Sequence, residues 1–301
     1  MTLRTVRNQY RAIRDDIGEL HTWRPLPNDE IQQIDPFLFL NHHGPQVYPP
    51  RNRGLPFGPH PHRGFETVTF IIEGSLTHRD TVGHESVIEA GGVQWMTAGR
   101  GLEHEEVSPP EFLERGGPLE ILQLWINLPS RFKFTDPRYV GLQKDQIAAF
   151  ENGGVTVNLI SGEWGGHRGP IESLTDVHMM TIALSAGSRI VLPAPRGRNV
   201  FFYIVRGTLT PGSAGVSPAV DEEQKRAGKM PAVPGTAFHL VDWNDDGDEI
   251  EIEAVDDAFI LFGHAKPYGE PVVAHGPFVM NTREEIVQAI RDYQMGKFGA
   301  A

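Results

Sequence analysis

The stretches PHPHRGFE, residues 59–66, and GRGLEHEE, residues 99–106, carry three imidazoles and several carboxylates. Alternate residues of an extended strand project to the same face, so His60 and His62 point the same way. A second strand that carries His104 can aim its imidazole into the same interior. Three imidazoles and one carboxylate are enough to hold a catalytic metal ion and leave room for a substrate. The two stretches therefore predict a metal site between β-strands.

The residues alone leave the carboxylate of this site open. Glu66 has the parity of the first two histidines, and Glu106 has the parity of His104. Glu103 and Glu105 have the opposite parity to His104, so we expect them to face solvent. The chain has no cysteine, which excludes disulfides and thiolate ligands. Any metal site must therefore be built from imidazole and carboxylate.

Strand and turn signals surround both stretches. Residues 67–72 form the apolar run TVTFII, which the turn signal Glu73-Gly74 separates from another strand-like segment. Glycines at 91–92 and 99–101 mark a tight turn and a chain bend just before the second stretch. The chain has 33 glycines and 24 prolines and few long segments of helical periodicity. This pattern predicts a small β-barrel.

A second half of the chain again reads as strands, at residues 155–160, 179–184, 200–205 and 259–262, which indicates an internal duplication. Where the first half has His-x-His, the second has PAPRGRN at residues 193–199, so we expect one metal site, in the first barrel. Turn-forming and charged residues at 211–235 predict an exposed loop insertion. The predicted domains are a first barrel at 1–140, a linker at 141–154, and a second barrel at 155–301 with an amphipathic helix at 282–296.

Longer strings carry a resemblance. Gly54, the two histidines and Glu66 resemble the first metal motif of the cupin superfamily, and residues 91–104 resemble the second, with Thr97 where cupins often have proline. Four strings resemble the pirin family within that superfamily: HPHRGFETV at 60–68, QWMTAGRG at 94–101, LQLWINL at 122–128 and HGPFVMNT at 275–282. The resemblance implies an all-β fold of two cupin barrels (double-stranded β-helices, or jelly rolls) in one chain, with a short C-terminal helix.

The resemblance also implies roles for individual residues. The pirin pattern places the fourth metal ligand two residues after the last histidine, at Glu106, whereas many cupins use the glutamate of the first motif, here Glu66. We expect Glu106 to be both ligand and catalytic base, and Glu66 to support a ligand through a hydrogen bond or to be the alternative ligand. The candidates for lining the substrate pocket are Trp95, Met96, Gln123 and Trp125.

Some pirins are dioxygenases that open the ring of a flavonol such as quercetin with O2, and the resemblance implies this reaction, most simply with Fe(II). Mn, Co, Ni, Cu and Zn ions suit the same donor set. The alternative is a non-catalytic, iron-binding, redox-sensitive partner of a transcription factor or a metabolic enzyme. The segment LFLNHH at residues 38–43 departs from the family pattern, which leaves the substrate preference open.

The charge and hydropathy of the chain limit the classes of partner that it can bind. The net charge of −12 opposes direct binding to nucleic acid, which depends on many Lys and Arg contacts to phosphate. No apolar stretch approaches the roughly 20 residues needed to span a bilayer, and the first residues lack the apolar core of a signal peptide. We therefore expect a cytoplasmic protein whose partners are a small aromatic substrate, O2 and, in the alternative, another protein.

Overall fold

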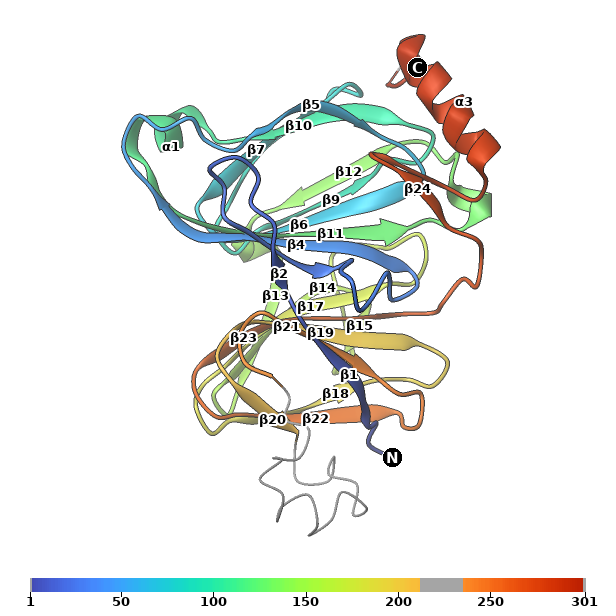
Figure 1. Ribbon diagram of the computed structural model, residues 1–301. Coiled ribbons are helices and arrows are strands. Elements are labelled where there is room, and N and C mark those ends of the chain that lie inside the picture. Colours follow the sequence, from blue (N-terminus) through green and yellow to red (C-terminus); the bar gives the residue numbers. More distant parts are fainter. Residues whose placement is uncertain (1, 212–234, 300–301) are drawn as a thin grey trace. The chain divides into compact units, whose positions relative to one another are not determined.

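The computed structural model describes residues 2–211 and 235–299 (Figure 1). Most of the predicted insertion, residues 212–234, lies outside the described residues. Within the described part, the elements are predominantly β-strands, with the two α-helices α1 (Pro110–Arg115) and α3 (Arg283–Gln294). The prediction of an all-β fold with a short C-terminal helix is confirmed.

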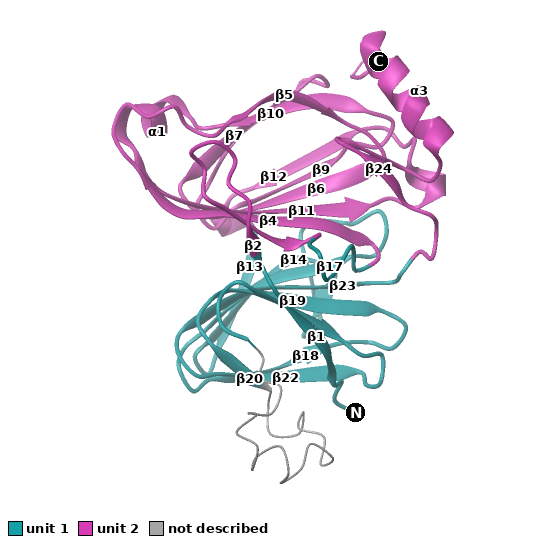
Figure 2. Cartoon of the chain, in the orientation of Figure 1, with its two compact units in different colours: residues 1–12, 28–34, 147–267 teal, residues 13–27, 35–146, 268–301 magenta. Residues whose placement is uncertain are grey.

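The chain divides into two compact units, and each unit takes segments from distant parts of the sequence (Figure 2). Unit 1 consists of residues 1–12, 28–34 and 147–267, and unit 2 of residues 13–27, 35–146 and 268–301. This division differs from the predicted boundaries at both ends of the chain. Residues 1–12 belong with the later barrel, and the C-terminal helix belongs with the earlier one. The main change of unit falls between residues 146 and 147, inside the predicted linker.

Unit 2 is built from two antiparallel sheets. The larger has the strand order β12 (Arg138–Leu142), β9 (Val93–Thr97), β6 (Phe65–Glu73), β11 (Gly117–Asn127), β4 (Phe37–Tyr48), β3 (Thr22–Leu26), β2 (Ile13–Arg14). The smaller has the order β5 (Phe57–His62), β10 (Leu102–Val107), β7 (Ser75–Asp80), β8 (Glu85–Glu89). Short 3-10 helices follow at Ser130–Phe132 and Lys144–Gln146. An apolar cluster that includes Ile71, Leu76, Ile88 and Ile121 joins the two sheets.

Unit 1 repeats this plan. Its larger sheet has the order β1 (Val6–Arg11), β21 (His239–Trp243), β19 (Asn199–Arg206), β23 (Ala258–Ala265), β17 (His178–Leu184), β14 (Val155–Ser161), β13 (Ala148–Asn152). Its smaller sheet has the order β18 (Arg189–Pro193), β22 (Glu249–Ala254), β20 (Leu209–Pro211), and β15 (Glu163–Trp164) pairs with β16 (His167–Arg168). The four strands predicted in the second half lie within β14, β17, β19 and β23.

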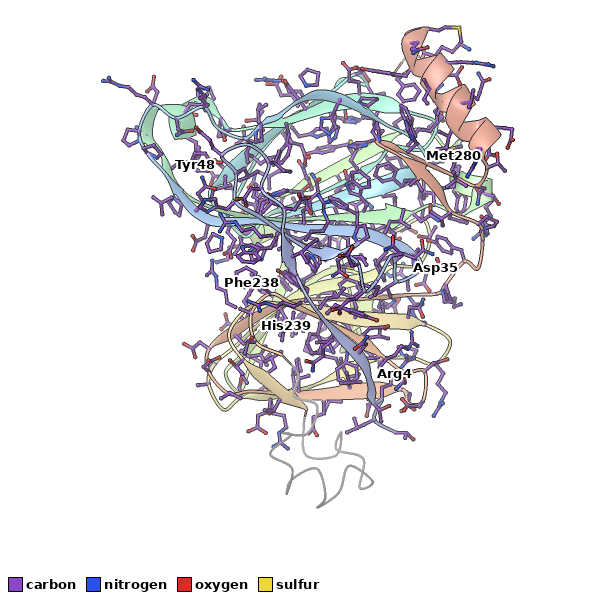
Figure 3. All side chains as sticks on the ribbon, in the orientation of Figure 1. Arg4, Asp35, Tyr48, Phe238, His239 and Met280 are labelled. Atoms are coloured by element: carbon purple, nitrogen blue, oxygen red, sulfur yellow. The ribbon has the colours of Figure 1, made fainter. Side chains whose placement is uncertain are left out.

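The N-terminal segment is tied into unit 1 by a buried arginine. The guanidinium of Arg4, labelled in Figure 3, donates to the backbone oxygens of Ala194 at 2.8 Å and Pro195 at 2.6 Å. It also pairs with Asp245 at 2.7 Å. Asp242, within β21, pairs with Arg7 at 3.2 Å. These carboxylates therefore anchor the first residues of the chain.

The C-terminal helix packs on unit 2. It begins with a capping box in which the side chain of Thr282 accepts a hydrogen bond from the backbone N–H of Glu285. Its buried residues join an apolar cluster with β25 (Phe278–Met280) and Phe298, and β25 pairs with β24 (Val273–His275). Asp292 on this helix pairs with Arg63 at 2.8 Å, directly after the first histidine stretch. The helix is therefore held against the strands that carry the candidate site.

Candidate metal centre

Strands β5 and β10 bring the three predicted histidines together. They pair antiparallel, with His104 opposite His60 and Leu102 opposite His62 (Figure 1 labels both strands). Because His60 and His62 are two residues apart, their side chains project to the same face. The candidate ligand nitrogens of the three histidines all lie within 4.8 Å of one another. Their ring centroids are 4.4 to 4.9 Å apart.

The state of these imidazoles fits a metal ion. Burial lowers the pKa of His62 and that of His104 well below the ordinary value, so both rings are neutral and keep a lone pair. The Nδ1 atom of His62 and the Nε2 atom of His104 are buried and have no hydrogen-bond partner. His60 uses its Nδ1 atom for a 2.8 Å hydrogen bond with the carbonyl oxygen of Gly58, which leaves Nε2 as its ligand atom. Buried nitrogens without partners are costly unless something binds them. Two such nitrogens converge here with the ring of His60, an arrangement that suits a divalent cation.

Glu106 lies on the same face of β10 as His104. The strand alternates between buried and partly exposed side chains, and Glu106 is fully buried. One carboxylate oxygen accepts hydrogen bonds from Thr69, at 2.9 Å, and from Gln94, and the other accepts from Gln123 at 2.6 Å. The carboxylate is therefore held by three uncharged donors. Among the described residues, the compact group of candidate ligands contains the three histidines alone.

The neighbours of Glu106 on β10 face outward. Glu105 is paired with Arg79 at 3.0 Å, and Glu103 accepts a 2.8 Å hydrogen bond from the hydroxyl of Tyr293. Both glutamates are only partly exposed, because these partners cover them. The alternation along β10 is the one expected from the sequence.

Glu66 faces the other side of the larger sheet, which differs from the parity expected for it. It accepts a 2.6 Å hydrogen bond from Thr97, whereas Thr69, three residues further along β6, bonds to Glu106. The pairing of β6 is regular between these positions, so Glu66 and Thr69 project to opposite faces. Gly64, at φ +88°, separates β5 from β6 and restarts the alternation. Burial raises the pKa of Glu66 to about 7.

The predicted pocket residues divide between the two faces. Gln123 and Trp125 lie on the face of the histidines, where Gln123 bonds to Glu106 and the Trp125 ring is 5.4 Å from that of His62. Met96 shares the parity of Gln94 on β9 and so belongs to this face. Trp95 has the parity of Thr97, on the face of Glu66. Three of the four candidates therefore lie on the side of the site.

Residues that the sequence analysis did not single out also reach the site. The Nδ1 atom of His78 lies 3.4 Å from Nδ1 of His104, and its Nε2 atom lies 3.1 Å from the carboxylate of Asp80. The ring of Tyr139 stacks on that of His78 at 4.1 Å. The signal in the sequence was His78-x-Asp80 at strand spacing, but the contact with His104 depends on β7 pairing with β10, which is not a local property.

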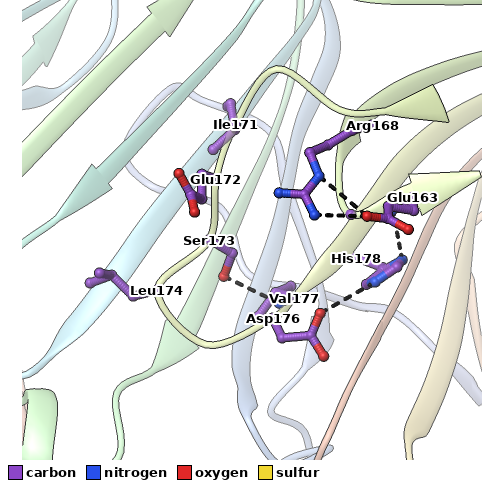
Figure 4. Close-up of a pocket in the computed structure, with 10 residues that line it drawn as sticks. Glu163, Arg168, Ile171, Glu172, Ser173, Leu174, Asp176, Val177 and His178 are labelled. Atoms are coloured by element: carbon purple, nitrogen blue, oxygen red, sulfur yellow. Dashed lines mark hydrogen bonds and ion pairs between the residues drawn. The ribbon is translucent and has the colours of Figure 1, made fainter.

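Unit 1 has a cleft lined by residues between 162 and 178 (Figure 4). The cleft has a volume of about 450 Å3. Within it, Arg168 pairs with Glu163 at 2.8 Å, and Asp176 lies 3.5 Å from His178. Among the described residues of unit 1, no group of three or more candidate ligands converges.

Two cupin-type barrels, one with a histidine cluster, define a bicupin. The family model named Pirin matches residues 19–126, and the model for the pirin C-terminal cupin domain matches residues 179–299. The chain belongs to the pirin family, which confirms the resemblance and the predicted fold of two cupin barrels.

Known proteins align with nearly the whole chain. A protein of Pseudomonas aeruginosa named "putative quercetin 2,3-dioxygenase" is 38% identical over 89% of this chain and 87% of its own. Human pirin is 36% identical over 92% of this chain and 87% of its own. The crystal structure of a quercetin 2,3-dioxygenase from Acinetobacter baumannii covers 99% of both chains at 30% identity, with a TM-score of 0.87. In the described residues, no helix has the length and apolar character needed to cross a membrane.

Proposed function

We propose that this protein is a metal-dependent dioxygenase that opens the ring of a flavonol such as quercetin with O2. The proposed ligands are His60, His62, His104 and Glu106, and the proposed ion is Fe(II). The observation that carries the proposal is the convergence of three imidazoles, with ligand atoms within 4.8 Å of one another and buried nitrogens of His62 and His104 that have no protein partner. The names of the P. aeruginosa relative and of the A. baumannii structure support the reaction.

The bound metal would supply a Lewis acid for the substrate oxygen and a redox route to O2. The protein's part is to place and deprotonate the substrate. One oxygen of Glu106 already accepts two hydrogen bonds, whereas the other accepts one, from Gln123. That second oxygen keeps one lone pair, which would either bind the ion or take the proton of the flavonol 3-hydroxyl group, but not both at once. The hydrogen bond from Gln123 holds this carboxylate oxygen in place.

The aromatic wall next to His62 suits a flat substrate. Trp125 stacks on Phe39 with ring centroids 4.6 Å apart, and its ring lies 4.5 Å from that of Phe65. The indole Nε1 atom of Trp125 is buried without a partner. A flavonol can pack against these rings and offer that nitrogen an acceptor. Both atoms of O2 enter the ring-opened product and carbon monoxide leaves, so no external reductant is needed.

The test is turnover of quercetin in air by protein loaded with Fe(II), Mn, Co, Ni, Cu or Zn in turn. We expect loss of quercetin absorbance, matched by O2 uptake and carbon monoxide release, with at least one ion. The variant His62→Ala should lose both metal and turnover, and His167→Ala, an exposed histidine of unit 1, should retain both. Absence of turnover with every ion would overturn the dioxygenase proposal and favour an iron-dependent regulatory partner.

A further inference from the structure

A row of polar side chains leads from His104 to the surface of unit 2. His104 contacts His78, and Nε2 of His78 lies 3.1 Å from Oδ2 of Asp80. The same Oδ2 atom lies 2.9 Å from Nδ1 of His84. The side chains of His78 and Asp80 are completely buried, whereas that of His84 is 41% exposed. Since β7 pairs with β10, Asp80 stands opposite His104 in the ladder.

The donors around Asp80 determine where the protons lie. The backbone N–H groups of Val82 and His84 donate to Oδ1, at 2.9 and 3.0 Å. An ionised carboxylate only accepts, so the imidazole N–H groups of His78 and His84 donate to Oδ2. With its ring proton on Nε2, His78 has a bare Nδ1 atom that accepts from the Nδ1–H group of His104. His104 is left with a bare Nε2 atom, which is its buried nitrogen without a partner.

We propose that His78 and Asp80 are positioning residues that hold His104 in the Nδ1–H tautomer and so keep Nε2 free for the metal ion. This inference rests on the metal site proposed above. A histidine ligand usually donates its other N–H group to an outer partner, which fixes the tautomer and the ring orientation. Here that partner is itself a histidine, and a buried carboxylate fixes the tautomer of that histidine.

Tyr139 links this support to that of Glu106. Its ring stacks on His78 with an angle of 12° between the planes, which restricts rotation of the imidazole. Its hydroxyl donates to Oε1 of Gln94 at 3.3 Å, and Nε2 of Gln94 donates to Glu106. Tyr139 therefore contacts both His78, which orients His104, and Gln94, which orients Glu106.

The substitution Asp80→Asn tests the proton arrangement at nearly constant shape. The two backbone N–H groups need an acceptor at the Oδ1 position, so the amide oxygen of the asparagine stays there. The amide NH2 group then takes the place of Oδ2 and presents a donor to Nε2 of His78. His78 must move its proton to Nδ1, where it faces the Nδ1–H group of His104. To keep the contact, His104 must shift its own proton to Nε2, which blocks the ligand atom.

The first measurement is Co(II) affinity by competition with a chelator, for wild type, Asp80→Asn and the matched control His84→Ala. The control removes the exposed end of the row but leaves Asp80 as acceptor for His78. We expect Asp80→Asn to bind Co(II) about 10- to 100-fold more weakly. His84→Ala should bind as wild type does. Equal affinity of a folded Asp80→Asn and wild type would overturn the proposal, as would an equal loss in His84→Ala.

The second measurement separates this inference from the proposed function. Long-range 1H–15N NMR of the metal-free protein reports the tautomer of each histidine. We expect Nδ1–H on His104 in wild type, and Nε2–H or a mixture in Asp80→Asn. If wild type binds no metal but His104 has this tautomer, the metal site fails while the positioning role stands. An Nε2–H tautomer of His104 in wild type would overturn the positioning role whether or not Asp80→Asn folds.

Discussion

The smaller sheets of the two units carry opposite chemistry at corresponding places. In unit 2, His104 on β10 stands opposite His60 on β5, in the same register in which Ile252 on β22 stands opposite Ile190 on β18 in unit 1. The next pair follows the same rule, with His62 and Leu102 in unit 2 and Leu192 and Ile250 in unit 1. One frame therefore holds a polar site in one copy and an apolar core in the other.

The difference shows what a polar interior costs and what it allows. The interior of unit 1 buries large apolar groups such as Phe202, Trp243 and Phe262, which stabilise a fold through burial and packing. Unit 2 instead buries imidazoles, carboxylates and amides, and several of their polar atoms have no partner in the protein. Such atoms disfavour folding unless a ligand binds them. The polar barrel is therefore the one suited to bind a metal, and the apolar barrel is suited to give stability.

The largest expected effect comes from a substitution in the apolar core of unit 1. Phe202 is fully buried in the core of unit 1, so Phe202→Ala should lower the free energy of unfolding by about 3 to 5 kcal/mol. The measurement is urea unfolding, with metal content determined before denaturant is added. The control Val191→Ala, at a side chain that is 44% exposed in the same unit, should change stability little. A loss in Phe202→Ala as small as in the control would contradict the assignment of stability to this core.

The next prediction makes unit 2 resemble unit 1. His104→Ile places in β10 the residue type that β22 has at Ile252, and it removes one of three imidazoles. We expect metal affinity to fall by more than about 100-fold, beyond the effect of losing an outer partner. The fold should persist, because an apolar side chain suits a buried position. Chelator competition and near-ultraviolet circular dichroism measure the two effects.

The matched control for that substitution is Leu102→Ile, on the same face of β10 and also buried. It should leave metal binding intact. Full retention of metal by His104→Ile would show that the ion binds elsewhere, and the contrast between the two barrels would then lose its functional meaning.

Strand alternation made much of this site predictable, because it is a local property. Alternation along one strand predicts that His60 and His62 share a face, and alternation along a second strand predicts the same for His104 and Glu106. Glu66 was misplaced because the chain bends at Gly64, where an added Cβ would collide with the backbone of Val279 from the C-terminal segment. No local pattern shows that collision.

Contacts between distant segments account for the rest of what the sequence did not reveal. The support of His104 by His78 depends on which strand lies beside β10. The exchange of terminal segments between the units depends on β1 pairing with β21, more than 200 residues later in the chain. Strand pairing of this kind is decided by the fold as a whole, so periodicity along one segment does not reveal it.

A third prediction concerns the pH dependence that the buried carboxyl of Glu66 gives unit 2. Its pKa in the folded protein is about 7, above the ordinary value of 4.5. The folded state therefore holds the proton more tightly than the unfolded state. The stabilisation is complete below pH 4.5 and is lost as the pH rises to 7. Glu66→Gln keeps an acceptor for Thr97 and cannot ionise, so its stability relative to wild type should increase over this interval by about 3 kcal/mol.

Urea unfolding of the metal-free proteins at pH 4.5 and 7.5 measures that difference, and the comparison with wild type cancels the titration of the other carboxyls. Glu151→Gln, at an exposed position of unit 1, is the matched control and should show no such trend. A difference between Glu66→Gln and wild type that stays constant with pH would mean that folding does not raise the pKa of Glu66.

The smallest expected effect concerns the clamp that α3 forms on β10 of unit 2. The hydroxyl of Tyr293 donates to Glu103, the residue before His104, at 2.8 Å. Tyr293→Phe removes this one hydrogen bond and keeps the ring, which packs in the cluster of Phe278 and Phe298. We expect a loss of about 0.5 to 1 kcal/mol in the free energy of unfolding, the usual contribution of one hydrogen bond. Metal affinity should hardly change, because His104 is positioned from its other side, by β7.

Val287→Ala, at an exposed position of the same helix, gives the background for the measurement. If Tyr293→Phe weakened metal binding as much as Asp80→Asn, the helix rather than β7 would position His104, and His78 and Asp80 would lose their proposed role.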